Sequence, residues 1–459
     1  MNDDLMGHSA ESIRAWDKAH VWHPFTPMAP YIEGDPVVVA RAEGFRLQDV
    51  DGKWYWDGSS SIWLNVHGHR VSALDGAIRA QLDRVAHSTL LGQGNVAATL
   101  LAKGLVDVAP DGLERVFFSD SGATAVEIAM KAAIQWFANQ GRPEKHKILG
   151  FTDNYHGDTM GAMSVAPDPI FHWPFLALLP EQPRAPYPYW YHCASGSAGP
   201  DECMAFSLGE VERLFDKRGH EIAAVIIEPV EGAGGIRPAP VGYLKALREL
   251  CDRRDVLMIV DEVATGFGKT GSMFACDAEG ITPDLLCLGK GLTAGYLPVA
   301  ATLANHRVFE PFLGARRNTL FHGHSFTGNQ LGCAVALENL KLMPAVMASL
   351  PAKIAWMEER LAPLASLPLV GDVRGRGFMR GFELVRDKRT REAMPAEMLS
   401  GYRVTDLARE KGLIVRPIGN TVIFMPPLAA PLETLAEMVD VLEEALLEAT
   451  VEMQEELAR

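Results

Sequence analysis

Two apolar stretches decide the fold of this chain: VLMIVDEV at residues 256–263 and PDLLCLGKG at residues 283–291. Each has the length of a strand, and a charged side chain follows its apolar part, Asp261 in the first and Lys290 in the second. Continuous apolar runs are typical of strands covered on both faces. A third such run lies at 222–230, and a helical pattern separates it from the first. This alternation predicts an α/β fold with a mostly parallel central sheet and helices on both faces.

The pattern changes towards both ends of the chain. Near the N-terminus, short β-favouring runs flank Asp51-Gly52, a pair typical of a tight hairpin turn. Towards the C-terminus, short strands alternate with helical segments, which is typical of a smaller α+β domain. The helices are expected near 328–345, 351–366, 402–412 and 431–458. The limits we expect are an N-terminal segment 1–70, a large domain 71–335 and a small domain 336–459.

Charge and composition disfavour several classes of protein. The 459 residues include 43 Lys and Arg against 58 Asp and Glu, a formal charge of −15, so we expect no nucleic-acid-binding surface. The first twenty residues lack the apolar segment of a secretory signal, and no apolar run approaches the ~18–20 residues of a membrane span. The six cysteines are widely spaced and are interpreted as buried thiols of a cytoplasmic protein.

Asp261 and Lys290 are candidate reactive groups, because open α/β sheets bind ligands at the carboxyl ends of their strands. A glycine-flanked, partly desolvated lysine favours the amine form that a Schiff-base nucleophile needs. A lysine whose head reaches solvent is the alternative, and for this residue alone it is the commoner case. An ionised Asp261 needs a cationic partner, either the protonated ring nitrogen of a cofactor or a structural arginine.

A phosphate site is expected where FFSDSGATAVEIAMK, residues 117–131, passes from a strand into a helix. The small residues Ser121, Gly122 and Ala123 let the backbone approach an anion, which the helix N-terminus attracts. A serine N-cap without any ligand accounts for the same pattern equally well.

Two further side chains have the chemistry to contact a flat or charged ligand. Tyr155 lies in a glycine-containing loop, where its ring either stacks on a planar cofactor or packs at the edge of the core. Arg416 stands between an apolar run and a proline, and it either clamps a substrate carboxylate or pairs with a neighbouring acid.

Two patterns are rejected. Gly-Lys-Thr at 268–270 follows a strand as in a P-loop, but that motif needs a glycine where Val263 stands. His-Gly-His at 67–69 and at 322–324 has no nearby carboxylate or cysteine cluster, so no metal site is predicted.

Six ordered segments resemble the class III (ω-type) aminotransferases, which use pyridoxal 5'-phosphate (PLP) and have the type I PLP-dependent transferase fold. They span residues 119–336 and are SDSGATAVEIAMK, YHGDTMGAMS, IIEPVEGAGG, IVDEVATGFGKTG, LGKGLTAGYLP and FHGHSFTGNQLGCAVA. Within that class the chain is most similar to the branch that forms 7,8-diaminopelargonate in biotin biosynthesis, because residues 20–28, 57–70 and 415–427 extend the likeness over nearly the whole chain. The resemblance implies a large domain with the mostly parallel sheet and a small α+β domain built from both chain ends.

The resemblance also implies roles around the cofactor. Lys290 would bind PLP covalently and then act as general acid–base, while Asp261 would keep the ring nitrogen protonated. Val263 would pack under the ring and Tyr155 over it, so that Lys290, Asp261 and Tyr155 form the catalytic group. The residues implied to bind the phosphate are Ser121, Gly122 and Ala123 of one subunit, with His324 and Ser325 of the partner in a homodimer whose active site lies at the interface.

The implied substrate-binding positions are Phe25, Trp63, Tyr155, Gly323 and Arg416, with Arg416 on the carboxylate of the keto acid. Phe25 stands where many members have tyrosine, and Ile62 where many have a second tryptophan. With Phe25, Ile62 and residues 87–102, the chain resembles the subset of family members that takes lysine rather than S-adenosylmethionine as amino donor.

The expected reaction is therefore ping-pong amino transfer to 7-keto-8-aminopelargonate, a small-molecule substrate, from S-adenosylmethionine or lysine. A broad ω-amino acid or amine:pyruvate aminotransferase is the first alternative. An aminomutase and a non-catalytic PLP-binding protein of the same fold are the others.

Overall fold

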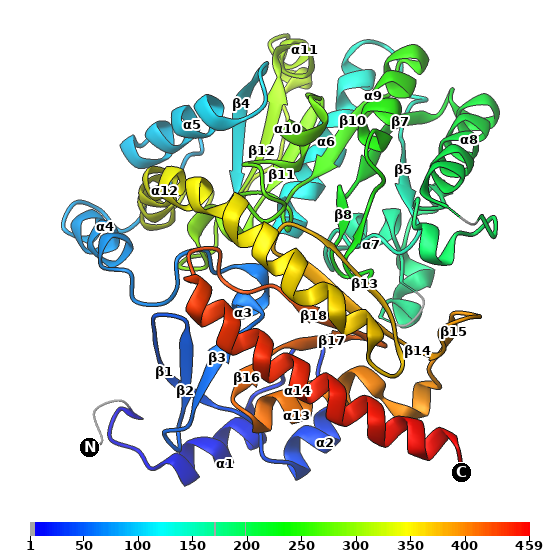
Figure 1. The fold of residues 1–459 in the computed structure, drawn as a ribbon. Helices are drawn as coiled ribbons and strands as arrows, with labels where there is room; N and C mark the ends of the chain where they lie inside the picture. The colour runs from blue at the N-terminus through cyan, green and yellow to red at the C-terminus, as the bar shows by residue number, and fades with distance from the viewer. Residues whose placement is uncertain (1–4, 169–170, 198) are drawn as a thin grey trace.

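The computed structural model describes residues 5–168, 171–197 and 199–459, and its centre is a seven-stranded sheet (Figure 1). In order across the sheet the strands are β4 (Leu113–Ser119), β12 (Ala300–Asn305), β11 (Leu285–Leu288), β10 (Leu257–Asp261), β7 (Ile222–Ile227), β5 (Lys147–Phe151) and β6 (Arg184–Ala185). The pairs from β11 to β6 are parallel, and β12 is antiparallel to both of its neighbours. The predicted mostly parallel sheet is confirmed, and its predicted strands at 222–230, 256–263 and 283–291 contain β7, β10 and β11.

Helices cover both faces of this sheet. In chain order the helices are α1 (Ala10–His20), α2 (Met28–Glu33), α3 (Ser60–Trp63), α4 (Ser72–Leu82), α5 (Val96–Val108), α6 (Gly122–Asn139), α7 (Met160–Val165), α8 (Pro200–Arg218), α9 (Tyr243–Arg254), α10 (Ala275–Glu279), α11 (His306–Phe309), α12 (Gln330–Leu361), α13 (Ser400–Glu410) and α14 (Leu432–Leu457). Successive strand residues point to opposite faces, so Leu257 and Ile259 of β10 pack in the apolar cluster of α6, whereas Met258 and Val260 pack in that of α8 and α9. This two-sided burial explains why the sequence of β10 is apolar without interruption.

The smaller part of the molecule is built from both ends of the chain. One sheet consists of β1 (Val39–Glu43), β2 (Arg46–Asp49), β3 (Trp54–Asp57) and β16 (Leu413–Ile414). Another contains β13 (Val370–Arg376), β14 (Met379–Asp387), β18 (Thr421–Phe424) and β17 (Arg416–Ile418), with β15 (Glu392–Ala393) beside β14. A short hairpin of β8 (Val230–Glu231) and β9 (Arg237–Pro238) follows β7.

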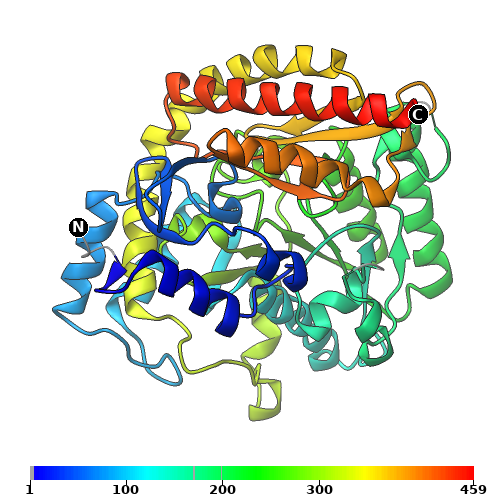
Figure 2. The same cartoon turned by 90° about the horizontal axis from the view of Figure 1, so that it is seen from below.

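The pairing of β3 with β16 joins residues near the N-terminus to residues near the C-terminus (Figures 1 and 2). The predicted hairpin is confirmed: β2 and β3 are antiparallel, and Gly52 between them has a φ of +88°. The domain limits at residues 70 and 335 stay predictions.

The long helix α12 corrects the sequence analysis. The sequence predicted two helices, 328–345 and 351–366, but one helix runs through both Pro344 and Pro351. Its buried residues recur every three or four positions across both prolines, at Met343, Val346, Leu350, Lys353 and Met357, so packing offsets the lost backbone bonds. By length and composition alone, residues 330–366 are long and apolar enough to cross a membrane, although core helices of soluble proteins meet the same criterion.

The cysteines give a second correction. All six were interpreted as buried thiols, but Cys193 and Cys203 form a disulfide with a Cα–Cα distance of 5.9 Å. The wide spacing of the cysteines hid this pair, because a loop brings Cys193 back onto the first turn of α8. The other four, Cys251, Cys276, Cys287 and Cys333, are buried free thiols.

Candidate active site

Lys290 lies at the carboxyl edge of the central sheet, two residues after β11. It has a φ of +41°, an unusual backbone conformation for lysine. Burial lowers the pKa of the amine, although the carboxylates of Glu228 and Asp261 act against that lowering. Among the described residues, Lys290 Nζ has no ion pair or hydrogen bond, and it lies 4.6 Å from the centroid of the Trp63 ring. Lys290 is partly exposed and lines a pocket beside the sheet edge, so its role as the reactive amine stays a prediction.

Asp261, the last residue of β10, is 4% exposed and bonded on both oxygens. Its Oδ2 lies 2.7 Å from Nδ1 of His156, and its Oδ1 accepts from the amide of Val263 at 3.0 Å. The partner of Asp261 in this structure is therefore a histidine, and not the structural arginine that the sequence analysis considered. The sequence placed His156 next to Tyr155 in the loop after β5, but it did not predict the contact between His156 and Asp261. The other ring nitrogen of His156 is buried without a partner.

The start of α6 meets the loop after β10 beside Lys290. A Cβ on Gly122 would lie 2.6 Å from Cγ1 of Val263, and one on Gly289 would lie 3.3 Å from the same atom. Ser121, Gly122 and Lys290 line one half-open pocket of about 390 Å³. Ser121 is also the N-cap of α6, with its Oγ accepting from the amide of Thr124 at 3.3 Å. The structure is therefore compatible both with a phosphate site and with a serine N-cap that binds no ligand, since a cap leaves other amides of the first helical turn available.

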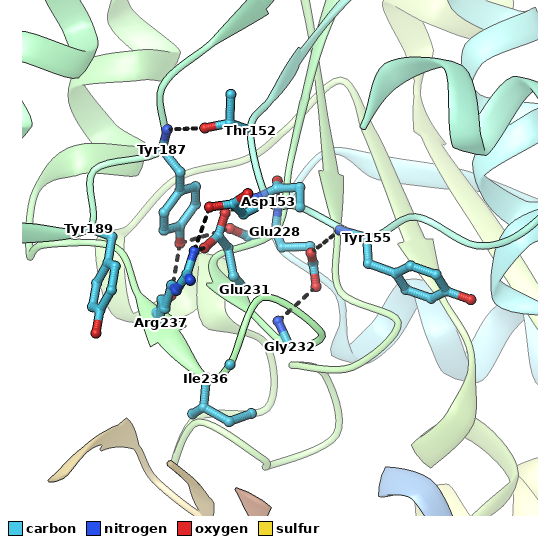
Figure 3. Close-up of polar contacts among 12 residues, drawn as sticks. Thr152, Asp153, Tyr155, Tyr187, Tyr189, Glu228, Glu231, Gly232, Ile236 and Arg237 are labelled. Atoms are coloured by element: carbon cyan, nitrogen blue, oxygen red, sulfur yellow. Dashed lines mark hydrogen bonds and ion pairs between the residues drawn. The ribbon is translucent and has the colours of Figure 1, made fainter. Parts of the chain in front are cut away.

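Tyr155 stands at the rim of the same edge, and a missed residue, Glu228, holds its backbone. Glu228 Oε1 accepts from the amide of Tyr155 at 2.7 Å and Oε2 from that of Gly232 at 3.1 Å (Figure 3). Burial raises the pKa of Glu228 to about 7. The ring of Tyr155 points away from this carboxylate, and its hydroxyl donates to Asp158 at 2.8 Å. Burial and Asp158 raise the pKa of the phenol, which keeps its proton in place.

A buried polar cluster stiffens the loop that carries Glu228. Asn154 donates to Glu231 at 2.6 Å and accepts from the amide of Glu228 at 3.1 Å. Arg237 reaches from β9 to Asp153 at 2.7 Å and to Glu231 at 3.4 Å (Figure 3). Burial raises the pKa of Glu231, and Arg237 is the cation that counters this. These hydrogen bonds and ion pairs therefore hold residues 228–231, the Glu-Pro-Val-Glu run after β7, in one conformation.

Trp63 reaches Lys290 from a strained turn. Residues 60–63 all have φ between 48° and 70°, and with the flanking bonds of Ser59 and Asn65 they form a segment that we call the left-handed turn, residues 59–65. Such backbone costs about 1–2 kcal/mol per residue. The ring of Trp63 is 6% exposed, and a Cβ on Gly232 would lie 2.8 Å from it, so Trp63 fills the space between Lys290 and the loop after β7.

Arg416, the first residue of β17, is half-buried, and its charge acts on the pKa of Tyr155. Among the described residues its guanidinium has no carboxylate partner. A pairing with a neighbouring acid is therefore not seen among these residues, and the role of Arg416 as a carboxylate clamp stays a prediction.

Four implied residues are not brought to Lys290 within this chain. Phe25 is 49% exposed and packs edge-on against Phe171. Gly323 and Ser325 lie in the loop before α12, where the Ser325 carbonyl accepts from a histidine of the 87–102 segment. His324 of the same loop lies 3.6 Å from Asp120, just ahead of α6.

The histidines of the two His-Gly-His triplets have other partners. His67 bonds Asn339 at 2.7 Å, His69 bonds Asp57 at 3.1 Å, and His322 lies 3.2 Å from Lys131. Among the described residues, no group of three or more metal-ligating side chains is found.

Comparison with known proteins identifies the family. Residues 30–446 match the model of the family described as aminotransferase class-III. The chain is 48% identical over 444 residues to the adenosylmethionine-8-amino-7-oxononanoate aminotransferase of Geobacter sulfurreducens, covering 96% of this chain and 98% of that protein. The crystal structure of adenosylmethionine-8-amino-7-oxononanoate aminotransferase from Methanocaldococcus jannaschii matches with a TM-score of 0.90 at 43% identity, over 95% of this chain and 99% of that one.

A second solved structure, a PLP-bound amine transaminase from an uncultivated Pseudomonas species, matches with a TM-score of 0.90 at 36% identity, over 94% of this chain and 99% of that one. The chain belongs to the class III aminotransferases. The predicted family and the predicted type I fold are both confirmed.

Proposed function

We propose that this chain uses PLP to transfer an amino group to 7-keto-8-aminopelargonate, giving 7,8-diaminopelargonate, with S-adenosylmethionine or lysine as the donor. The observation that carries the proposal is the likeness at 48% identity, over nearly the full length of both chains, to the G. sulfurreducens protein of that name. The site supports the same class of reaction, because a desolvated amine, a buried carboxylate and a helix N-terminus meet at one edge of the sheet.

The residues at this edge fit PLP, which has an aldehyde, a ring nitrogen and a phosphate. Lys290 offers an unpaired amine, Asp261 a buried carboxylate, and the first turn of α6 amides without intrahelical acceptors. When bound, PLP would supply a carbonyl for amine exchange and a ring that delocalises the electrons of a carbanion.

Lys290 and Asp261 have different tasks in this proposal. Burial lowers the pKa of the Lys290 amine, which favours the neutral form that acts as a nucleophile and afterwards as a base for the proton on the reacting carbon. His156 and the amide of Val263 hold the carboxylate of Asp261, whose charge favours a proton on a facing ring nitrogen. Val263 would pack under the cofactor ring and Tyr155 over it, as the family resemblance implies.

Arg416 is the proposed clamp for the carboxylate of the keto acid, since a planar guanidinium binds carboxylates with two hydrogen bonds. The ring of Trp63 would bound the same space on the side of Lys290. Phe25 and Gly323 would complete the substrate pocket from the loops that carry them.

We further propose a homodimer in which His324 and Ser325 reach the partner's phosphate site. Large apolar side chains near this loop support an interface, because Phe321 is 71% exposed, Phe326 61% and Leu91 64%. Light scattering of the purified protein tests the dimer, and a monomer that binds PLP normally would contradict it.

A broad amine:pyruvate aminotransferase is the second candidate, favoured by the likeness to the Pseudomonas amine transaminase. One assay separates the two. The purified protein is incubated with 7-keto-8-aminopelargonate and each donor in turn, and with simple amines and pyruvate. The proposal expects 7,8-diaminopelargonate with at least one donor. Turnover of simple amines alone would refute it, and bleaching of the cofactor band by S-adenosylmethionine alone would exclude lysine.

A further inference from the structure

The segment rejected as a P-loop contains a buried lysine that the proposed reaction does not use. Lys269, in the loop after β10, is 1% exposed, and lysine is rarely buried without partners. Its Nζ donates to the carbonyl of Asn65 at 3.2 Å and to Oγ of Ser60 at 3.5 Å. Both acceptors belong to the left-handed turn, so a side chain of the large domain holds an N-terminal segment in place.

The left-handed turn needs external anchors, because its own backbone is unfavourable. Four successive residues with side chains have positive φ, and Ile62, at 65°, is β-branched. The internal bonds run from the amide of Trp63 to Ser59 at 2.8 Å and from that of Leu64 to Ser60 at 2.9 Å. The same number of bonds is available to ordinary right-handed backbone, so they do not select this conformation.

Two anchors fix the turn at different points. Asp57, fully buried at the end of β3, accepts from the amide and the hydroxyl of Ser61, each at 2.8 Å. Lys269 fixes the opposite end through the carbonyl of Asn65, and it also reaches back to Ser60, whose hydroxyl bonds the carbonyl of Met425. Asp57 thus supports the beginning of the turn and Lys269 its end.

Between these two anchors the turn presents Trp63, whose ring centroid lies 4.6 Å from Lys290 Nζ. We propose that Lys269 is a positioning residue that holds the left-handed turn and thereby keeps the ring of Trp63 against Lys290. The inference goes beyond the proposed reaction and rests on it only where turnover is measured.

The first test compares Lys269→Met with Lys353→Met by hydrogen exchange of the PLP-loaded protein. Lys353 is a matched control, because it is 9% exposed and donates to a carbonyl, that of Leu428, at 2.9 Å. Lys269→Met should raise amide exchange in residues 60–65 at least tenfold, and Lys269→Arg should stay within threefold of the wild type. Lys353→Met should leave these amides unchanged. A folded Lys269→Met protein with wild-type exchange in the turn overturns the proposal.

The second test asks whether Lys269 acts through Trp63. With the donor that the wild type accepts, Lys269→Met should lower kcat/KM at least tenfold, with Lys269→Arg restoring most of it. In a Trp63→Ala background the same substitution should cost less than threefold, because the ring that it positions is gone. Equal costs in both backgrounds would refute the coupling. Hydrogen exchange is measured without turnover. A wild-type protein that does not turn over the biotin precursor would therefore refute the proposed function, but the hydrogen-exchange test of Lys269 could still be made.

If Lys269→Met does not fold, Ser60→Ala replaces it. This variant removes one acceptor of Lys269 and the bond to Met425. It should raise exchange in the left-handed turn and lower kcat/KM for the donor, and a Ser60→Ala protein that matches the wild type in both measurements overturns the proposal.

Discussion

Replacing Gly122 with alanine should loosen the proposed phosphate site, and the structure sets the size of the effect. The added Cβ would lie 2.6 Å from Cγ1 and 3.1 Å from Cγ2 of Val263. Carbon atoms in contact prefer about 3.5–4.0 Å, so either the first turn of α6 or Val263 must move by roughly 1 Å. Rotation of Val263 gives little relief, because two of its three Cβ substituents are methyl groups. Its amide is also bonded to Asp261 at 3.0 Å.

Overpacking of this kind costs about 1–3 kcal/mol of folding free energy. A displacement of the first α6 amides should also weaken PLP binding about tenfold, which corresponds to roughly 1.4 kcal/mol. The assay is a titration of the apoprotein with PLP, followed by cofactor absorbance, together with urea unfolding. Val263→Ala in the Gly122→Ala protein removes both clashing methyl groups and should restore the affinity.

The matched control is Gly76→Ala, a helical glycine of α4 with no atom within 4 Å of the added Cβ. It should leave PLP affinity unchanged and stabilise the protein by about 0.5–1 kcal/mol. If Gly122→Ala binds PLP as tightly as the wild type, the first turn of α6 is not the phosphate site. If Val263→Ala fails to rescue the loss, the clash with Val263 is not its cause.

Three further predictions follow from the site and the core. Asp261→Asn should keep the link between PLP and Lys290 but slow the first half-reaction by on the order of a hundredfold; a near-normal single-turnover rate would remove Asp261 from the mechanism. Thiol titration of the denatured, unreduced protein should find the four free cysteines, because Cys193 and Cys203 are paired, and a count of six would contradict the disulfide. Burial raises the pKa of Glu228 from 4.5 to about 7, so between these pH values the folded state keeps a proton that the unfolded state has released. The free energy of unfolding therefore falls as the pH rises through this window. At about 1.4 kcal/mol per pKa unit the loss is roughly 3 kcal/mol; urea unfolding at pH 5 and pH 8 should show it in the wild type and not in Glu228→Gln, and equal pH dependence would refute it.

The sequence predicted those features that local chemistry determines. The apolar runs of β7, β10 and β11 are typical of strands covered on both faces, and the charged residues that follow two of them placed Asp261 and Lys290 at one edge. Asp51-Gly52 predicted the hairpin for a similar reason, since few residue pairs accept that backbone.

Features that depend on contacts between distant segments were missed. The expected break between residues 345 and 351 was wrong, because the buried stripe that offsets the cost of Pro344 and Pro351 appears only in the packed helix. The disulfide was missed because Cys193 approaches Cys203 only once a loop folds back, and spacing alone does not show that. The limits at residues 70 and 335 and the partner's contribution of His324 stay predictions.

Burial explains both what was found and what was missed at the site. Removing a charged group from water disfavours its charged form, so burial lowers the pKa of Lys290 and of Lys269, the latter to about 7, and raises that of Glu228 to about 7. The sequence indicated Lys290 because it ends a strand. It could not indicate Lys269 or Glu228, because their burial depends on the left-handed turn and on the loop after β7. A lysine in an apolar loop with no assigned function is therefore a reason to look for the segment that it anchors.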